Sequence, residues 1–405
     1  MEELENGQVL GFCGEEDRKD LRTIWEACFD DTPAFVDYYF RKRMDPLRCM
    51  ALRECGEMVA ALHLNRHRVE FLGKNHDVSY FVGVSTYEVH RGKGHMRKLM
   101  EAAIRELHAE GELFSLLMPV DSRLYDRFGF AFVEDHLQTD FNPEHETALE
   151  KEWRGGPGRF PARGSYRMVD RQDPGRFRQE WEGVRAGMIS CYGLEMVPLF
   201  GEGRFQALVE ELAVEDGGIL LGERGYAAFY PGETLEVREI AVLDRDAMFE
   251  ILRHLREKAG KRTIGLNTHL KDCIKYLIPY TNDNTIKVRP FMMARILDAR
   301  RLLAAYVEAH PLEVGRELRI QVLDGLIPEN NRTFALRENH VEVLQGQEVS
   351  ADLALGIDAL AQLVFGYGNA AGTCFLHERS GKGSVDLPFL ERAFPVRVHY
   401  FNEWI

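Results

Sequence analysis

Hydrophobic positions in the first third of the chain predict strands that flank one amphipathic helix. Residues 58–71, 77–86 and 113–118 have the composition of strands, with a turn at 72–75. Between the last two, apolar residues recur at helical spacing, at Met96, Leu99, Met100, Ala103, Ile104 and Leu107. The order predicts a βαβ unit, which binds anions where its helix begins.

The middle of the chain contains a weaker copy of this pattern. Residues 235–242 and 264–267 are expected to be strands, and 248–258 the helix between them. The turn before the helix has no glycine, and Asp244 and Asp246 stand where an anion would need to bind. If the unit is a duplicate, its anion site has been lost.

The last part of the chain has a different pattern. Residues 291–298 open a helix candidate that runs through Tyr306, followed by strands such as 318–323 and by a helix at 357–365. Since 405 residues are too many for one ordinary domain and 154–161 are rich in glycine and proline, we predict domains at 1–154, 162–290 and 291–405.

Composition excludes several classes of protein. The 65 acidic and 51 basic residues give a formal charge of -14, which repels nucleic acid and anionic membranes and attracts cations. Seven scattered cysteines without a C-x-x-C pair, and histidines without an H-E-x-x-H pattern, predict neither disulfides nor a metal. Without a signal peptide or a membrane-length apolar run, we expect a cytoplasmic protein.

The segment 84–99 carries the clearest chemistry. Gly92 and Gly94 allow close approach of the backbone to a ligand, and Arg91, Lys93 and Arg97 add positive charge beside the expected helix N-terminus. These residues fit a pyrophosphate, although a tight turn into a helix would also explain them. His90 and His95 flank the loop, and we expect both at the surface beside the phosphate site.

Arg91, Gly94 and Leu99 resemble the R-x-x-G-x-G/A signature of GNAT acetyltransferases, from which Met96 departs. The whole chain resembles the Eis-like (enhanced intracellular survival) group within that superfamily. The resemblance implies an α+β protein with two tandem GNAT-type domains, the second degenerate, and a C-terminal sterol-carrier-like domain. It also implies acetyl-CoA as co-substrate, held by Val84, Ser85, Thr86, Gly92, Lys93, Gly94, His95, Met96, Arg97, Val120 and Asp121.

Two residues receive catalytic roles from the resemblance. Tyr125, in a run similar to the family's Y-x-x-F-G-[FYW] motif, is the expected general acid that protonates the leaving thiolate, although it could also be a core aromatic that packs beside Phe128. The terminal carboxylate at Ile405 is the expected base for the attacking amine. Glu403 is the competing carboxylate, and a terminus that only packs is the remaining alternative.

The expected activity is direct acetyl transfer to an amine of a cationic small molecule, such as an aminoglycoside or a polyamine. Aromatic and acidic residues at 25–40 suit such an acceptor, although most of these aromatics would serve as helix core. The alternatives are a lysine acetyltransferase acting on proteins or peptides, and a non-catalytic protein that binds CoA or lipid. The resemblance also implies a homo-oligomer, commonly a hexamer.

Overall fold

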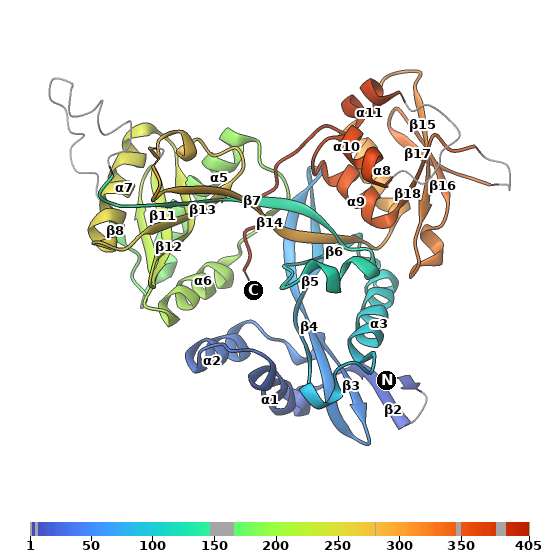
Figure 1. The fold of residues 1–405 in the computed structure, drawn as a ribbon, viewed down its shortest axis with the longest axis horizontal. Coiled ribbons are helices and arrows are strands. Elements are labelled where there is room, and N and C mark those ends of the chain that lie inside the picture. The colour runs from blue at the N-terminus through green and yellow to red at the C-terminus, as the bar shows by residue number, and fades with distance from the viewer. Residues whose placement is uncertain are drawn as a thin grey trace.

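The computed structural model describes residues 2–4, 7–145, 166–279, 281–345, 350–377 and 386–404. The first, second and third domains follow one another along the chain and form three distinct lobes around a central crossing of strands (Figure 1). The expected boundary at 154–161 lies outside the described residues.

In the first domain, two helices precede β3 in the chain, and a third helix lies between β5 and β6. Its helices are α1 (Arg18–Cys28), α2 (Pro33–Lys42) and α3 (His95–Ala109). Its strands are β1 (Glu2–Leu4), β2 (Gln8–Phe12), β3 (Cys49–Glu54), β4 (Glu57–Phe71), β5 (Lys74–Thr86), β6 (Phe114–Leu117) and β7 (Ala131–Phe141). The apolar stripe predicted for 96–107 forms the buried face of α3, so the β5-α3-β6 unit follows the sequence pattern.

The second domain repeats this order of helices and strands. Its helices are α5 (Arg178–Tyr192), α6 (Glu202–Val214) and α7 (Arg245–Ala259). Its strands are β8 (Arg167–Met168), β9 (Val197–Pro198), β10 (Gly218–Gly222), β11 (Gly225–Pro231), β12 (Leu235–Val242), β13 (Ile264–His269) and β14 (Thr285–Ile296). Strands β12 and β13 are parallel and are joined through α7, as β5 and β6 are joined through α3.

The N-terminus of α7 is occupied by the chain's own carboxylate. The side chain of Asp244 accepts a hydrogen bond from the backbone N–H of Ala247 at 2.8 Å and pairs with Arg224. A carboxylate in this position uses the donors that an incoming phosphate would need.

The two domains share one sheet because β14 crosses between them. Met293 of β14 pairs with Leu117 of β6 on one side and with Phe132 of β7 on the other, and β7 also pairs with β13. The helix expected from residue 291 is wrong in its first half, since these residues continue β14 up to Ile296 and the helix begins at Ala299. The segment is buried on both faces, and a short continuous apolar run does not distinguish strand from helix. The boundary expected at 290 therefore falls inside a strand.

The third domain is a small sheet covered by helices. The sheet order is β17-β16-β15-β18, with β15 at Glu317–Leu323, β16 at Thr333–Arg337, β17 at His340–Leu344 and β18 at Leu353–Gly356. The helices are α8 (Ala299–Ala309), α9 (Ile357–Phe365), α10 (Ala370–His377) and α11 (Leu387–Ala393). Across the described parts of all three domains, no helix combines the length and apolarity needed to cross a membrane.

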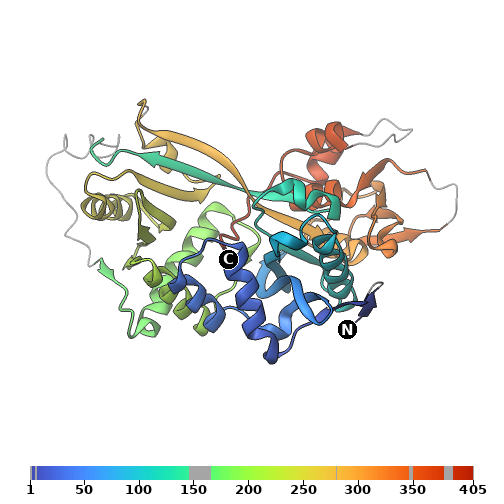
Figure 2. The ribbon, with the colours of Figure 1, turned by 60° about the horizontal axis from the view of Figure 1, so that its bottom comes forward.

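The segment after α11 leaves the third domain and runs back between the first two. The backbone N–H of Arg397 still bonds to Gly366 at 3.0 Å, whereas Tyr400 donates its N–H to Glu195 of the second domain at 3.1 Å. Tyr80 of β5 donates its hydroxyl to the carbonyl of Glu403 at 3.2 Å. This end of the chain lies in the middle of the molecule in both views (Figures 1 and 2).

Candidate functional site

Strand β5 has one edge with free backbone groups near its end. Ser85 pairs with Ala61 of β4 and Val82 pairs with His63, so β5 has one extra residue here and forms a bulge at Gly83, whose φ is +59°. Strand β6 pairs with β5 only at Tyr80 and Phe81. Beyond that point, no strand in the described ranges covers the second edge of β5, which leaves the backbone at Val84 available to a ligand. The carbonyl of Thr86 already accepts from Cys28 Sγ at 3.5 Å and from Arg91 Nε at 3.3 Å.

The loop after β5 forms an anion-binding turn. Gly92 and Gly94 have φ values of +78° and +82°, and a β-carbon at either position would face open space. Helix α3 begins directly after Gly94, where the first N–H groups of a helix have no intrahelical partner. This geometry fits a pyrophosphate group.

The open edge and the loop border the same cavity, which has a volume of about 550 Å³. Eight of the residues expected to hold the donor line it, namely Val84, Ser85, Thr86, Gly92, Gly94, His95, Met96 and Arg97. The other lining residues are Cys28, Phe29, His90, Arg91, Leu124, Arg127 and Phe128. Cys28 and Phe29 lie at the end of α1, far from β5 in sequence, and no local pattern connects them to it.

Three of the expected donor residues are not among those that line this cavity. Lys93 is exposed, and its Nζ lies 3.5 Å from Nδ1 of His90. Val120 is 89% exposed. Asp121 caps the short helix η5 (Ser122–Leu124), and its carboxylate accepts from the backbone N–H of Arg123 at 3.1 Å and from the Arg123 guanidinium.

Tyr125 lies beside the cavity rather than in its lining. It follows Leu124 and directly precedes the short helix η6 (Asp126–Phe128), and Leu124, Arg127 and Phe128 line the cavity. Its side chain is 7% exposed and packs near Phe130, with ring centroids 6.4 Å apart. Burial raises the pKa of the Tyr125 phenol, which therefore keeps its proton at neutral pH.

His95 is buried, contrary to the surface position expected from the sequence. It is the first residue of α3, and only 2% of its surface is exposed because its ring turns inward toward Glu54 of β3. Burial lowers the pKa of this imidazole. His90, in contrast, is partly exposed, at the end of the short helix η4 (Glu88–His90).

A second cavity of about 210 Å³ lies where the first two domains meet the C-terminal segment. Aromatic rings from Phe35 of α2, Tyr230 of β11 and Trp404 line it, together with Glu211, Leu212, Glu215 and Arg238. Trp404 is the last described residue of the chain. Ile405, the expected base, lies outside the described residues.

Buried ion pairs surround this second cavity. Glu211 pairs with Arg238 and, at 3.1 Å, with Arg43, while Glu403 pairs with Arg204 and, at 3.6 Å, with Arg43. Burial alone would raise the pKa of Glu211, but the neighbouring guanidinium groups outweigh it and lower this pKa to about 2. The carboxylate of Glu403, the competing candidate for the base, thus forms ion pairs with two arginines.

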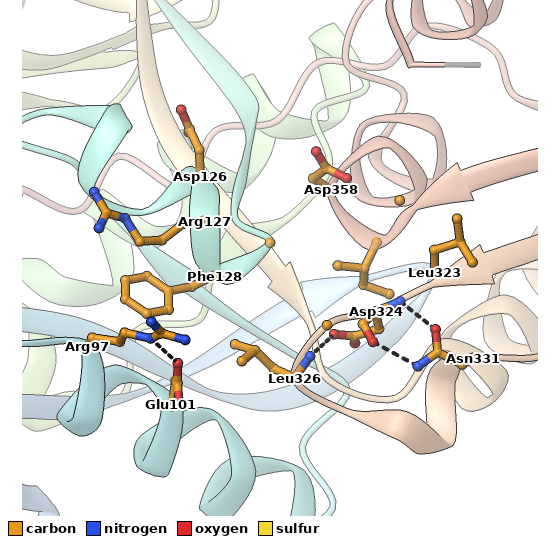
Figure 3. A pocket seen from close by; sticks show the side chains of 14 residues that line it. Arg97, Glu101, Asp126, Arg127, Phe128, Leu323, Asp324, Leu326, Asn331 and Asp358 are labelled. Carbon is orange, nitrogen blue, oxygen red and sulfur yellow. Dashed lines mark hydrogen bonds and ion pairs between the residues drawn. The ribbon is translucent and has the colours of Figure 1, made fainter. Parts of the chain in front are cut away.

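A third cavity, of about 680 Å³, separates the first domain from the third (Figure 3). Arg97, Arg127 and Phe128 line both this cavity and the donor-side cavity, so the two are neighbours. Asp126 and Asp358 lie at its upper edge, one on each side (Figure 3). Burial, and then the charge of Asp358, raise the pKa of Asp126.

Comparisons with known families identify two of the domains. Residues 13–133 match the acetyltransferase (GNAT) domain, and residues 294–402 match the sterol carrier protein domain. No curated protein matches the sequence significantly.

Solved structures share the fold over nearly the whole chain. A GCN5-related N-acetyltransferase from Kribbella flavida is 19% identical, with a TM-score of 0.75 and 98% of each chain covered. A GCN5-related N-acetyltransferase from Anabaena variabilis is 18% identical, with a TM-score of 0.74 and coverage of 97% of this chain and 98% of that one. Eis1 from Mycobacterium abscessus is 14% identical, with a TM-score of 0.74 and coverage of 98% and 99%.

The family matches agree with the geometry of the site. The GNAT match contains the open edge of β5, the glycine loop and Tyr125, and domains of this family use acetyl-CoA as co-substrate. The chain is an acyltransferase in which a GNAT acetyltransferase domain is followed, at the C-terminal end, by a sterol carrier protein domain.

Proposed function

We propose that this protein transfers the acetyl group of acetyl-CoA directly to an amine of a cationic small molecule, such as an aminoglycoside or a polyamine. One observation carries the proposal: a single cavity joins the open edge of β5 to the N-terminus of α3, with Tyr125 beside it. The reaction breaks the thioester C–S bond and forms an amide C–N bond, so one proton must leave the amine and one must reach the thiolate.

The donor-binding residues have complementary roles in this proposal. Backbone groups of Val84, Ser85 and Thr86 would pair with the amides of the pantetheine arm, because β6 does not pair with them. The loop from Gly92 to Arg97 would hold the pyrophosphate, since both glycines leave room for it and the helix offers free N–H groups. Arg91 and Arg97 add positive charge on the cavity wall.

Tyr125 is the proposed general acid. A phenol with an ordinary pKa near 10 is protonated at neutral pH, and burial raises the pKa of Tyr125 further. Its neighbours Leu124 and Phe128 line the cavity, which supports a hydroxyl close to the departing sulfur.

The proposed base is the carboxylate at Ile405. The support comes from the preceding residues, because Trp404 lines the second cavity and Phe401 donates its N–H to both carboxylate oxygens of Glu134, at 3.1 and 3.0 Å. Glu403 suits the role less well, since its carboxylate is already paired with Arg43 and Arg204.

The second cavity is the proposed acceptor pocket. Three aromatic rings and the exposed carboxylate of Glu215 favour a positively charged ligand over a neutral one, since the cation in the lining, Arg238, is already paired with Glu211. The formal charge of -14 points the same way. We also propose that the protein is cytoplasmic and forms a homo-oligomer, a hexamer by the family resemblance. Light scattering on the purified protein would test the oligomeric state.

The third domain is proposed to direct the C-terminal segment rather than to carry lipid. Its sheet residues Leu318, Ile320, Phe334 and Leu353 are buried against helices of the same domain in one continuous core. Side chains of the domain thus fill its interior in the described region.

The test is CoA release from acetyl-CoA with a panel of aminoglycosides, polyamines and lysine peptides, with mass spectrometry of each acceptor. We expect acetylation of a polycationic small molecule, a loss of about 100-fold or more in kcat for Tyr125→Phe, and no change for the exposed control Tyr276→Phe. If only the lysine peptides were acetylated, the acceptor would be a protein or peptide lysine and not a cationic small molecule. Donor binding without transfer to any amine would contradict the proposal.

The base needs a separate variant. Extending the chain by a few residues after Ile405 removes its carboxylate without deleting a side chain. Full activity of the extended chain would reject the terminal carboxylate as base, whereas a large fall in kcat with unchanged donor affinity would support it.

A further inference from the structure

Two histidines and one glutamate converge next to the donor loop, although the glutamate is far from the histidines in sequence. Glu54 ends β3, His90 ends η4, and His95 begins α3. Nδ1 of His90 lies 3.2 Å from Oε2 of Glu54, and Nε2 of His95 lies 3.4 Å from Oε1 of Glu54. One ligand atom from each residue lies within 4.8 Å of the other two.

His95 lacks the hydrogen bonds that a buried imidazole normally makes. Neither of its ring nitrogens makes a hydrogen bond in the described structure, although the side chain is almost fully buried. Buried polar side-chain atoms are hydrogen-bonded in the large majority of cases, so each exception requires an explanation. The ring is held in place with its Nε2 directed at the Glu54 carboxylate.

Glu54 is in turn oriented by a second layer of residues. The amide of Gln8 donates a hydrogen bond to Oε1 of Glu54 at 2.5 Å, and the ammonium of Lys98 donates to the amide oxygen of Gln8. Lys98 thereby fixes the orientation of the Gln8 side-chain amide. Outer partners of this kind are typical of ligands in metal sites, where they orient the first layer.

We propose that Glu54, His90 and His95 form a binding site for a divalent transition-metal ion of the zinc, cobalt and nickel class. Two donor atoms that bind one tetrahedral ion at about 2.0–2.1 Å lie about 3.3 Å apart, close to the two separations observed here. Imidazole nitrogen excludes magnesium and calcium as the preferred ions, and three protein ligands leave one position for water or an anion.

The positive charges of two lysines near the site would repel a bound cation. Lys93 lies 3.5 Å from Nδ1 of His90 and must move away, which its exposed side chain allows. Lys98 is held by Gln8 and stays. Since His90 and His95 also line the donor cavity, a bound ion would tie β3 to the loop that carries Gly92 and Gly94.

The experiment is titration of the full-length protein with Zn²⁺ in competition with a chromophoric chelator, followed by Co²⁺ absorption spectroscopy. The baseline is Cys55→Ser, because this exposed thiol follows Glu54 in sequence and could bind zinc by itself. In that background we expect one tight site, weakened by about 100-fold or more in His90→Gln and in Glu54→Gln. Lys93→Gln should tighten it, because it removes the competing ammonium.

The control is His340→Gln, an exposed histidine of the third domain, which should bind zinc as the baseline does. His90 is partly exposed, so its replacement should leave the circular dichroism spectrum unchanged. Equal zinc affinity in the baseline protein and His90→Gln, or no stoichiometric site in the baseline, would overturn the proposal.

Discussion

Trp25 of α1 lies against Gly83 of β5 so closely that a β-carbon at residue 83 would stand 2.3 Å from Cζ3 of the indole. Gly83 is also the positive-φ residue of the β5 bulge, which opens the strand toward the donor cavity. Helix α1 therefore packs directly, through Trp25, on the bulge that precedes the donor-binding edge.

We predict that Gly83→Ala loses about 2–5 kcal/mol of unfolding free energy, because a methyl group adds both backbone strain and a clash with Trp25. The matched control is Gly56→Ala, which has a φ of +87° and open space around its β-carbon. It should lose only about 1–2 kcal/mol. Urea unfolding measures the free energy lost in each variant. Equal losses would mean that the Trp25 side chain moves aside without cost.

The pH dependence of kcat tests the role of Tyr125. The raised pKa means that the acid form persists through neutral pH and is lost only as pH rises above about 10. We therefore predict that any loss of kcat due to Tyr125 begins above pH 10, and that Tyr125→Phe removes this alkaline limb. An alkaline limb below pH 9 that disappears in Tyr125→Phe would contradict the assignment.

Glu211 should make the junction of the domains sensitive to acid. Its folded-state pKa of about 2 lies below its ordinary value of 4.5, so its stabilisation is complete above pH 4.5 and is lost as pH falls toward 2. We predict that Glu211→Gln costs about 3–5 kcal/mol at pH 7, and that its difference from wild type shrinks across this window. The exposed Glu215→Gln is the control. A pH-independent difference would show that packing, not charge, is lost.

The buried pair of Arg295 and Asp324 joins the third domain to the donor site. Arg295 binds Asp324 at 2.6 Å and also donates to the carbonyl of Phe128, which lines the donor cavity. We predict that Asp324→Ala destabilises the protein by about 3–5 kcal/mol, since it leaves a buried guanidinium without its anion. The double variant Arg295→Met, Asp324→Leu should recover only part of this loss in thermal unfolding, because Asp324 also accepts from the backbone N–H groups of Leu326 and Ile327 and from the Asn330 amide. No recovery would mean that the pair's geometry is itself required.

Local periodicity was sufficient to predict several elements from the sequence. The helix at 357–365 and the strand at 235–242 have the predicted bounds, and the stripe of α3 is buried as expected. These segments have apolar residues at clear spacing. The glycine loop was found for the same reason, since its conformation depends on a few adjacent residues.

The features that depend on distant contacts could not be predicted. Strand β14 was mistaken in part for a helix because its neighbours β6 and β7 come from another domain. The burial of His95 and its convergence with Glu54 depend on how β3 packs beside α3, which no spacing in the sequence shows. The placement of Cys28 and Phe29 in the donor cavity has the same origin.

Calorimetric titration of acetyl-CoA into the wild type, Gly94→Ala and the control Gly56→Ala tests the central claim most directly. A methyl group at residue 94 would fill the space proposed for the pyrophosphate, so we predict that donor affinity falls by about tenfold or more in Gly94→Ala alone. Equal donor affinity in all three proteins would contradict a donor site at the N-terminus of α3.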